Sequence, residues 1–452
     1  MTGDLDQILI SYQQPKFTER LERLRAETIG AAVFSADDPR REQLRQILRQ
    51  ISQRKDQAVA EYTEKFDKVR LTPEQFAITR KELQKAHQET DKSLLAALRQ
   101  AIKNVRKYQA EIFIGDKNTH PGMKYTPVKR VGVCVPGVSA PLPSTVIMTA
   151  VPAQVAGVKE IAVVSPPRFN GSIHPVILAT CHELDISEVY RIGGAQAVAA
   201  LAYGTQTIRK VDKIVGPGSQ WVQTAKLELF GHVGIDSIAG PSEVLIIAND
   251  KANPAWVAAD MLSQAEHAPG SAVIFTDSQK FAEKVLDELK RQSISPRTCA
   301  GGKPCPQVAG LNRVKETIKC LKKFGGIVVF GRMDDAIKHA NHFAPEHLEI
   351  QCGEQSRKIA DQIEDAGAIF IGDYSPVAVG DYWAGPSHTL PTGGSARFFS
   401  ALSANDFIKS ISIIEYDKKQ LAESADDIIR LAEAEGLDAH AKSIKIRQES
   451  AR

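Results

Sequence analysis

Adjacent Glu346 and His347 are candidates for acid–base chemistry. They occur in Asn341-His-Phe-Ala-Pro-Glu-His-Leu-Glu349, where Pro345 ends a predicted helix because its ring nitrogen carries no N–H. The pair therefore falls in the turn that enters a predicted strand, where two neighbouring side chains can converge. Together they offer a carboxylate base for water and an imidazole for proton transfer near neutral pH. A solvated turn with two ordinary polar residues explains the segment equally well.

A second candidate group lies in Ser263-Gln-Ala-Glu-His-Ala268, at the end of a predicted helix. Gln264 and His267 are three residues apart and share a helix face, so an amide oxygen and an imidazole nitrogen could reach one cation. On this segment alone, a polar helix end in water is the simpler interpretation. The same interpretation covers His339 and His342, a His-x-x-His pair without a carboxylate ligand placed beside it.

The third segment, residues 372–394, is rich in Gly, Pro and aromatic residues and follows a predicted strand. Such a composition is typical of loops and turns. It supplies Asp373, Asp381 and His388. A loop of roughly 20 residues with no structure of its own is uncommon unless it is functional, which favours a functional loop here.

The fourth segment, Ala434-Glu-Gly-Leu-Asp-Ala-His440, is by itself typical of a helix end with a solvated histidine. Gln264, His267, Asp381 and His440 together offer two imidazole nitrogens, one amide oxygen and one carboxylate. That is an acceptable ligand set for zinc with open positions, and its oxygen donors also admit manganese or cobalt. Spacing alone does not select these four from 11 His and the many carboxylates.

Two series of alternating strands and helices must position these segments, and they predict an α/β fold with parallel sheets. The strands of the first series are predicted at 131–135, 161–164, 187–192 and 213–215. Those of the second are predicted at 244–247, 272–275, 327–330, 347–351 and 368–371. Helices are also predicted over 37–66, over 72–113 with interruptions, and from an N-cap at Ser424 to Glu435, with Gly436 as the C-cap.

The dinucleotide fingerprint Gly-x-Gly-x-x-Gly is missing after the first strand, and so is a Walker A loop. Val135-Pro-Gly137 and Gly216-Pro-Gly218 can still bring backbone close to a ligand at strand ends, where open α/β sheets bind. The fold pattern alone therefore indicates a ligand-binding enzyme and no particular chemistry.

Composition excludes several classes of protein. Fifty-seven Lys and Arg against 54 Asp and Glu leave a charge of +3, which argues against a nucleic-acid partner. No apolar run reaches the roughly 18 residues that a membrane span needs. The acidic start, Met1 to Asp6, has no apolar core of a secretory signal, and the six Cys form no Cys-x-x-Cys pair. We therefore expect a cytoplasmic protein with a large core.

The four segments, with further motifs in the same order, make the chain resemble the histidinol dehydrogenases, enzymes of the last two steps of histidine biosynthesis. The resemblance runs from about residue 30 to 445 and rests on several separate motifs. They are Arg130-Val-Gly-Val-Cys-Val-Pro-Gly137, Gly193-Gly-Ala-Gln196, Ala239-Gly-Pro-Ser-Glu243, Ser263-Gln-Ala-Glu-His267, Phe343-Ala-Pro-Glu-His-Leu348, Ser387-His-Thr-Leu-Pro-Thr-Gly-Gly394 and Glu435-Gly-Leu-Asp-Ala-His440.

The resemblance implies a role for each of these residues. The zinc ligands, one ion per subunit, would be Gln264, His267, Asp381 and His440, and the catalytic acid–base pair Glu346 and His347. The substrate-binding positions would be the same four ligands with Ser242, His347, His388 and Glu435. The NAD positions would be Cys134, Gln196 and Ser219; Cys134 and Ser219 stand where family members often carry Tyr and Asn. Cys supplies neither the aromatic surface nor the hydroxyl of Tyr.

The family's fold implies two incomplete Rossmann-like domains with small helical terminal segments, in a homodimer whose active sites are shared. The tail that carries Glu435 and His440 would reach the neighbouring subunit's site. On this basis residues 1–30 form an N-terminal extension and 401–452 a helical dimerisation tail. Residues 31–130 and 241–400 form the larger domain with the metal and catalytic residues, and 131–240 the second Rossmann-like domain.

The expected activity is the four-electron, NAD-dependent oxidation of L-histidinol through L-histidinal to L-histidine. One alternative is a related zinc enzyme that oxidises another primary alcohol, such as a sulfonated diol. His388 and Glu435 argue against it because both suit a cationic amino–imidazole substrate. A second alternative, a non-catalytic regulator or metal-binding scaffold, is disfavoured by the intact Glu346 and His347.

Overall fold

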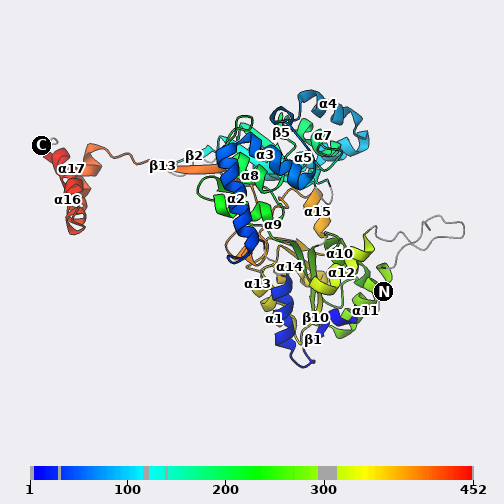
Figure 1. Ribbon diagram of the computed structural model, residues 1–452. Helices are drawn as coiled ribbons and strands as arrows, with labels where there is room; N and C mark the ends of the chain where they lie inside the picture. The colour runs from blue at the N-terminus through cyan, green and yellow to red at the C-terminus, as the bar shows by residue number, and fades with distance from the viewer. Residues whose placement is uncertain are drawn as a thin grey trace. The chain divides into compact units, whose positions relative to one another are not determined.

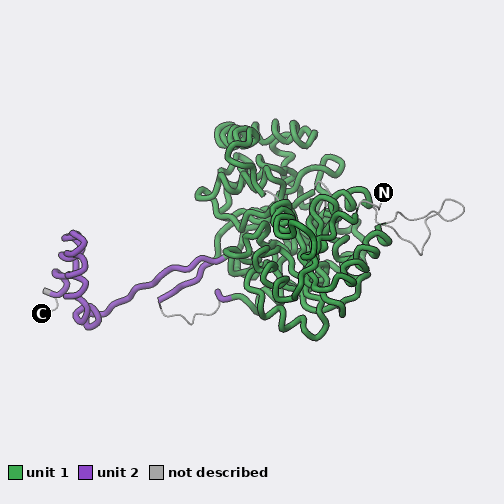
Figure 2. Tube along the Cα trace, turned by 90° about the horizontal axis from the view of Figure 1, so that it is seen from below, with its two compact units in different colours: residues 1–113, 127–407 green, residues 114–126, 408–452 purple. Residues whose placement is uncertain are grey.

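The computed structural model describes residues 5–28, 32–115, 122–137, 141–267, 269–293 and 313–449. The chain divides into two units (Figure 2). We call residues 1–113 with 127–407 the main unit, and residues 114–126 with 408–452 the tail unit. The main unit contains two parallel sheets, and these sheets determine where the candidate site residues lie.

The first sheet of the main unit has six strands, and every neighbouring pair is parallel. Its order is β1 (Leu9–Ser11), β10 (Gly325–Val329), β9 (Gly270–Thr276), β8 (Ser242–Ala248), β11 (His347–Gln351) and β12 (Ala368–Ile371). Strand order reverses between β8 and β11, because β9, β10 and β1 lie on one side of β8 and the later strands on the other. The candidate catalytic residue His347 begins β11, directly after Glu346, and the candidate substrate-binding residue Ser242 begins the neighbouring β8.

Helices bury both faces of the six-stranded sheet (Figure 1). Val244 and Ile246 of β8 pack with one set of helices, whereas Leu245 and Ile247 pack with the other, as the two-residue period of a strand requires. The first set is α10 (Pro254–Ala265), α11 (Gln279–Gln292) and α12 (Val314–Phe324), and the second is α1 (Phe17–Thr28), α13 (Met333–Phe343) and α14 (Ser356–Ala360). Burial on both faces explains the continuous apolar runs by which these strands were predicted.

The second sheet of the main unit has five parallel strands. Its order is β5 (Glu188–Tyr190), β4 (Glu160–Val164), β3 (Arg130–Cys134), β6 (Lys213–Val215) and β7 (Gly234–Ile235). Its helices are α2 (Pro39–Arg54), α3 (Asp56–Asp67), α4 (Arg80–Glu89), α5 (Lys92–Ile112), α6 (Pro143–Val155), α7 (Pro175–Glu183), α8 (Gly194–Tyr203) and α9 (Gln220–Leu229). Strand order reverses between β3 and β6, and the carboxyl ends at such a reversal are where open α/β sheets bind ligands.

The tail unit consists of a two-stranded sheet and a helix pair. Strand β2 (Met123–Pro127) pairs with β13 (Ile408–Ser412), and α16 (Lys418–Ala434) packs on α17 (Asp438–Glu449). The predicted N-cap at Ser424 is wrong, because α16 begins earlier at a capping box formed by Asp417 and Gln420. Inside the helix, Ser424 Oγ donates to the carbonyl of Gln420 at 2.9 Å.

The α/β fold with two parallel sheets is confirmed, and three local differences have simple causes. The helix predicted over 37–66 breaks into α2 and α3 at Lys55, whose φ is +53°. Strand β1, from the predicted N-terminal extension, has only three residues and shows no period in the sequence. Helix α15 (Val377–Tyr382) lies in the segment predicted as a loop. The domain boundaries proposed from the sequence stay a prediction.

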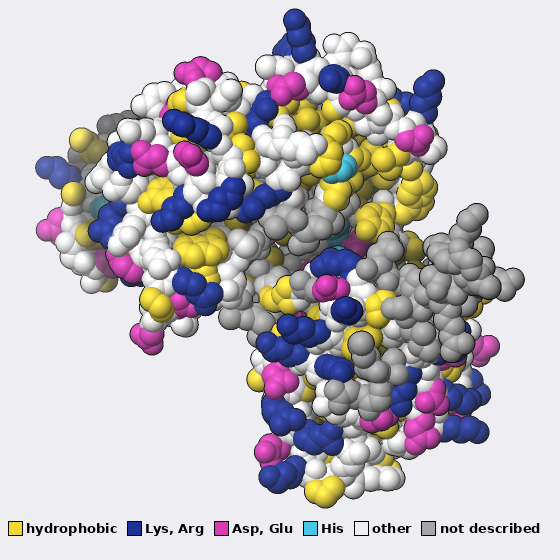
Figure 3. All heavy atoms as spheres, turned by 45° about the vertical axis from the view of Figure 1, so that its right-hand side comes forward, with side chains coloured by type: hydrophobic (Ala, Val, Ile, Leu, Met, Phe, Trp, Pro, Cys, Tyr) yellow, Lys and Arg dark blue, Asp and Glu magenta, His cyan; other side chains and the backbone are white. Residues whose placement is uncertain are grey.

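The surface agrees with the composition. On the face drawn in Figure 3, Lys and Arg side chains are interspersed with Asp and Glu. Among the described residues, no helix combines the length and the hydropathy that crossing a bilayer requires.

Truncation of Ile274 tests the packing of the six-stranded sheet. Ile274 lies on β9, is fully buried and packs in the core shared by α10, α11 and α12. We expect Ile274→Ala to lower the free energy of unfolding by about 2–5 kcal/mol. As a control, Leu94→Ala removes a 41% exposed side chain on α5 and should change it by about 0.5 kcal/mol or less. Equal unfolding midpoints for the two variants in urea would contradict this packing.

Candidate active site

Glu346 and His347 lie at the amino end of β11, in the turn predicted from the sequence. Helix α13 ends at Phe343, and Ala344 reverses the chain with a φ of +49°. Both side chains are buried, with exposed fractions of 6% for Glu346 and 3% for His347. The interpretation of a solvated turn is therefore wrong, and a buried acid–base pair occupies this strand end.

The carboxylate of Glu346 is held by the neighbouring strand. Its Oε2 accepts from Ser242 Oγ at 2.8 Å and from the backbone N–H of Glu243 at 2.8 Å. Ser242 Oγ in turn accepts from Gln264 Nε2 at 2.7 Å. The register, in which His347 pairs with Val244, places the first residues of β8 beside Glu346. A chain of hydrogen bonds thus connects the end of α10 with the amino ends of β8 and β11.

His347 presents one ring nitrogen toward a possible substrate. Its Nδ1 lies 3.0 Å from the carbonyl oxygen of Glu243, which fixes the ring if Nδ1 carries the proton. Its Nε2 is buried and has no hydrogen-bond partner among the described residues. The nearest carboxylate oxygen, Asp381 Oδ1, is 3.8 Å away, too far for a hydrogen bond. A buried nitrogen without a partner is costly, and Nε2 is therefore the atom available to a bound molecule.

Burial and neighbouring charges shift both pKa values of the pair. Burial raises the pKa of Glu346; His347 and the hydrogen bonds from Glu243 and Ser242 oppose this only in part, so the net pKa is raised. Burial lowers the pKa of His347, but the negative charges of Glu346 and Asp381 outweigh it and raise the pKa to about 9. A carboxylate with a raised pKa is a stronger base toward water, and the imidazole is held ready to exchange a proton.

Asp381 lies on α15 and faces the same cavity as His347. This cavity has a volume of about 420 Å³, and His388 and Phe370 also line it. Burial raises the pKa of Asp381, but the interaction with nearby His347 outweighs it, so the net pKa lies below its usual range. Asp381 is therefore ionised, as a metal-ligating carboxylate must be.

The four proposed metal ligands are split between the two units. Gln264 is buried near the end of α10, whereas His267 follows that helix and is exposed. His440 lies in the tail unit and is exposed there, as is Glu435. In the part of the chain that the structure describes, no three His, Cys, Asp or Glu side chains form a group that could hold a metal. Gln264 is an amide and His440 belongs to the tail unit, so His267 and Asp381 are the only proposed ligands of these four residue types in the main unit.

Two of the three proposed NAD positions share a cavity. Gln196 and Ser219 line a cavity of about 370 Å³ with Asp67, Arg168 and Trp221. Cys134 ends β3, and burial raises the pKa of its thiol to about 12.

The ends of β3 and β6 come close together at Gly216, whose φ is +106°. A β-carbon at that position would lie 2.4 Å from the carbonyl oxygen of Cys134, so only glycine fits. Asp236 and the buried Lys226 hold this turn, since Asp236 Oδ2 accepts from the Gly216 N–H at 2.7 Å and Lys226 Nζ donates to its carbonyl at 3.2 Å.

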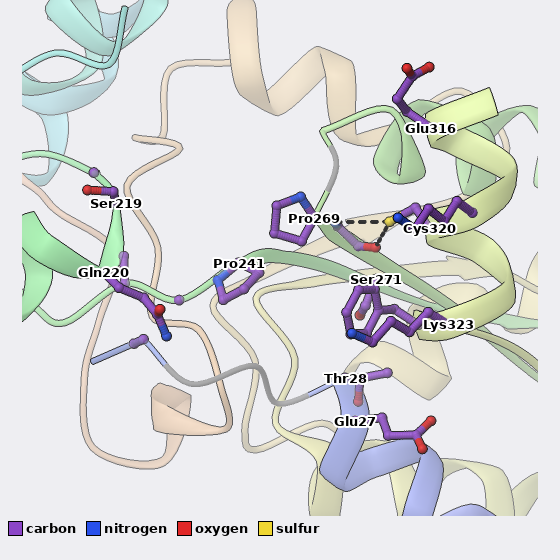
Figure 4. Close-up of a pocket in the computed structure, with 17 residues that line it drawn as sticks. Glu27, Thr28, Ser219, Gln220, Pro241, Pro269, Ser271, Glu316, Cys320 and Lys323 are labelled. Carbon is purple, nitrogen blue, oxygen red and sulfur yellow. Dashed lines mark hydrogen bonds between the residues drawn. The ribbon is translucent and has the colours of Figure 1, made fainter. Parts of the chain in front are cut away.

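A cavity of about 870 Å³ lies beside these proposed NAD positions (Figure 4). Ser219 and Gln220 face it from one side, and Cys320 and Lys323 of α12 from the other. Neither Glu346 nor His347 lines it. The cavity of about 420 Å³ is the one that His347 of the candidate acid–base pair lines.

Comparison with known proteins decides the family. A model of the family "Histidinol dehydrogenase" matches residues 34–448. The chain belongs to the histidinol dehydrogenase family. It is 45% identical over 409 residues to a histidinol dehydrogenase of Rhodopirellula baltica, covering 89% of this chain and 85% of the relative. It is 43% identical over 438 residues to one of Synechococcus sp., covering 95% and 96%.

Solved structures agree with this assignment. The crystal structure of histidinol dehydrogenase from Elizabethkingia anophelis matches with a TM-score of 0.84 and 34% identity, over 97% of this chain and 98% of that one. An acetylating aldehyde dehydrogenase from Geobacillus thermoglucosidasius matches with a TM-score of 0.50 at 13% identity, and this likeness concerns the fold alone.

Sequence reasoning gave Glu243 no role, although it lies in one of the motifs. Its side chain is buried, and its Oε1 accepts from the Gly393 N–H at 2.7 Å, which ties β8 to the long loop after α15. Burial raises the pKa of Glu243, and the charge of Glu346 raises it further, to about 8. A carboxylate directly before the apolar run Val244-Leu-Ile-Ile247 was the available signal, since such a position is rarely charged without a function.

The raised pKa of Glu243 predicts a pH dependence of stability. Folded protein keeps this proton up to about pH 8, whereas the unfolded chain releases it near its ordinary value of 4.5. Stability should therefore fall as the pH rises from about 4.5 to 8, by up to about 1.4 kcal/mol per unit for this group. Glu243→Gln cannot titrate and should lose less stability over this range. Urea unfolding at pH 5 to 8 tests this; parallel curves for wild type and variant would contradict it.

Proposed function

We propose that the chain oxidises L-histidinol through L-histidinal to L-histidine, with two NAD as hydride acceptors and one zinc ion per subunit. The observation that carries this proposal is the buried pair Glu346 and His347 beside the ionised Asp381, in a chain of the histidinol dehydrogenase family. Water must supply the second oxygen of the product. The site accordingly needs both a base for the alcohol and a base for water.

The donor set at the site fits zinc. Gln264 donates from Nε2 to Ser242, which leaves the carbonyl end of its amide for a metal. The ionised carboxylate of Asp381 and the imidazole of His267 would be further ligands, and His440 a fourth. Bound zinc would supply a fixed point for the nitrogens of the substrate and so orient the reacting carbon.

Two residues of the chain would move the protons. In its neutral form, which a pKa of about 9 makes the main form only in alkaline solution, His347 takes the hydroxyl proton in the first oxidation. Nε2 is the atom that accepts it, since this ring nitrogen has no partner among the described residues. Glu346 deprotonates the water that adds to the aldehyde, and Ser242 and Glu243 hold its carboxylate in place. As the hydrate forms, His347 returns its proton to the former aldehyde oxygen. The neutral His347 then takes the proton of the hydrate in the second oxidation.

Cysteine chemistry is not needed for this reaction. Burial raises the pKa of the free thiols that the structure describes, so none is an activated nucleophile. These are Cys134, Cys181, Cys320 and Cys352. Reduced thiols of this kind support the proposal that the protein works in the cytoplasm.

NAD would bind at the carboxyl ends of β3 and β6. Gln196 and Ser219 line the cavity there. The turn at Gly216, which only glycine fits, brings the ends of the two strands into close contact. Ser219 precedes the first turn of α9, whose N–H groups favour a phosphate. Cys134 contributes a small buried thiol in place of an aromatic surface.

The proposal includes a homodimer in which the tail of one chain completes the site of the other. Glu435 and His440 would reach the second copy in this way. Support comes from large apolar side chains that the tail unit exposes, among them Ile414 at 85%, Leu431 at 67% and Tyr416 at 59%. Apolar groups exposed together mark interaction surfaces. The oxidation of another primary alcohol is supported by no observation here.

The decisive test of the activity is the amount of NADH formed from L-histidinol. A four-electron oxidation gives two NADH per histidinol, whereas a simple alcohol dehydrogenase gives one. We expect two, and we expect a zinc chelator to abolish turnover while far-UV circular dichroism stays unchanged, because the apolar cores of both sheets are packed without the metal. One NADH per histidinol, or none, would overturn the proposal.

Glu346→Gln should separate the two half-reactions. Oxidation of histidinol to histidinal needs no water and should fall only modestly. Oxidation of histidinal to histidine needs an activated water and should fall by about 10²–10⁴-fold. Rates measured with histidinol and with histidinal as separate substrates test this. Equal losses in both steps would show that Glu346 acts otherwise.

Mixed dimers test the shared site. His347→Ala and His440→Ala should each be inactive alone. In a mixed dimer, one site would join the intact core of the His440→Ala chain to the intact tail of the other chain. Random pairing makes half of the dimers mixed, each with one good site of two, so co-expression should restore about a quarter of wild-type activity. No recovery would show that His440 serves its own chain.

A further inference from the structure

A cluster of polar side chains lies beside the active site, and no step of the proposed reaction uses it. Glu349 and Gln351 follow His347 on the same face of β11, with exposed fractions of 1% and 2%. Asp260 of α10 approaches them from the helix that covers this face. A carboxyl group and an amide buried in an apolar sheet, with a second, partly buried carboxyl group beside them, require an explanation.

Glu349 is bonded to two different elements. Its Oε1 accepts from the backbone N–H of Val377, the first residue of α15, at 2.8 Å. Its second oxygen, Oε2, accepts from Gln351 Nε2 at 3.1 Å. The carboxyl group also shares a hydrogen bond with Asp260 of α10, and Gln351 Nε2 donates to Asp260 Oδ2 at 2.8 Å.

These two elements and β11 itself carry the site. Asp381 follows Val377 by about one helical turn on α15, and Gln264 follows Asp260 by about one turn on α10. A helix moves largely as a unit, so a bond at one turn constrains the side chain on the next. Glu349 thereby connects the strand of His347 with the helices of Asp381 and Gln264.

Helix α15 depends on this connection because it has little support of its own. It has six residues, and isolated helices of that length do not form in water. The first N–H groups of a helix have no acceptor inside it, and Glu349 provides an acceptor for the first of them in α15, the N–H of Val377. Its other anchors are the buried side chain of Val377 and the close packing of Gly380 on Phe370, where a β-carbon would lie 2.6 Å from the ring.

We propose that Glu349 is a positioning residue that aligns Asp381 and Gln264 with the Glu346–His347 pair. Burial supports this role, because it raises the pKa of Glu349 to about 8 and so favours a neutral carboxyl that can donate to Asp260 while accepting from Val377. The proposal rests on the proposed function only for the metal-binding and catalytic roles of the residues that Glu349 aligns. Their alignment can be measured without turnover.

The test compares three variants of the full-length protein. Glu349→Leu removes the acceptor for the Val377 N–H, whereas Glu349→Gln keeps an acceptor and a donor of the same size. Ile350→Ala is the matched control, since Ile350 is fully buried in the core on the opposite face of β11 and its loss destabilises the same strand without touching α15.

We expect Glu349→Leu to accelerate amide hydrogen exchange across residues 377–382 at least tenfold in metal-free protein. Zinc, measured by competition with a chromophoric chelator, should bind about 10–100-fold more weakly. The kcat for histidinol should fall by a similar factor, and the KM for NAD should stay unchanged because the NAD positions lie on the other sheet. Glu349→Gln should restore all three within a few-fold. Ile350→Ala should lower the melting temperature and leave exchange in α15 and zinc affinity unchanged.

Two variants of Val377 keep the test decisive if Glu349→Leu does not fold. Val377→Pro removes only the donor that Glu349 accepts from, at a first helical position where proline fits, and Pro376 before it is already extended with a ψ of 158°. Val377→Ala trims the side chain and keeps the N–H. We expect Val377→Pro to weaken zinc binding at least tenfold more than Val377→Ala does.

Unchanged exchange in α15 in Glu349→Leu, or equal zinc affinity in the Val377 pair, would overturn the proposal. So would an Ile350→Ala variant that loses as much zinc affinity as Glu349→Leu. If wild type failed to oxidise histidinol, the proposed function would fall, but the exchange of residues 377–382 would still decide the role of Glu349.

Discussion

The buried carboxylate of Glu346 is the group on which the arrangement of the site depends. A carboxylate with 6% exposure needs hydrogen-bond donors inside the protein, and Ser242 and the Glu243 N–H provide them from β8. They can do so only in the parallel register that pairs His347 with Val244. A slip of one residue would turn these side chains to the other face of the sheet. Packing of β8 on β11 therefore determines the geometry of the catalytic pair.

In the two sheets of the main unit, the candidate site residues lie at opposite ends of the strands. Of the proposed NAD positions, Cys134 ends β3 and Ser219 follows β6, at the carboxyl ends where strand order reverses and where open α/β sheets bind ligands. The candidate catalytic pair lies instead at the amino end of β11, beside the amino end of β8. There, strand ends provide donors for Glu346, and the next polar residues along β11, Glu349 and Gln351, reach the helices that carry Asp381 and Gln264. Support for the site thus runs along one face of one strand.

Local patterns explain what could be predicted from the sequence. Apolar runs marked the buried strands, and Pro345 marked the turn before Glu346 and His347. Helix α15 was missed because its support is tertiary: the acceptor for its first N–H, Glu349, is distant in the sequence. Ser424 was a wrong N-cap because Asp417 with Gln420 forms a better one earlier. Buried Glu243 and Glu349 have partners on other elements, and no spacing in the sequence reveals such partners.

We propose that α10 and α15 bring metal ligands of one chain beside the buried Glu346 and His347, and that a second chain completes the ligand set. A crystal structure of the zinc-loaded protein, with anomalous data collected at the zinc absorption edge, tests this most directly. We expect one anomalous peak per subunit within bonding distance of Gln264, His267 and Asp381, with His440 contributed by the other chain. A peak bound elsewhere, or His440 bound to the zinc of its own chain, would contradict it.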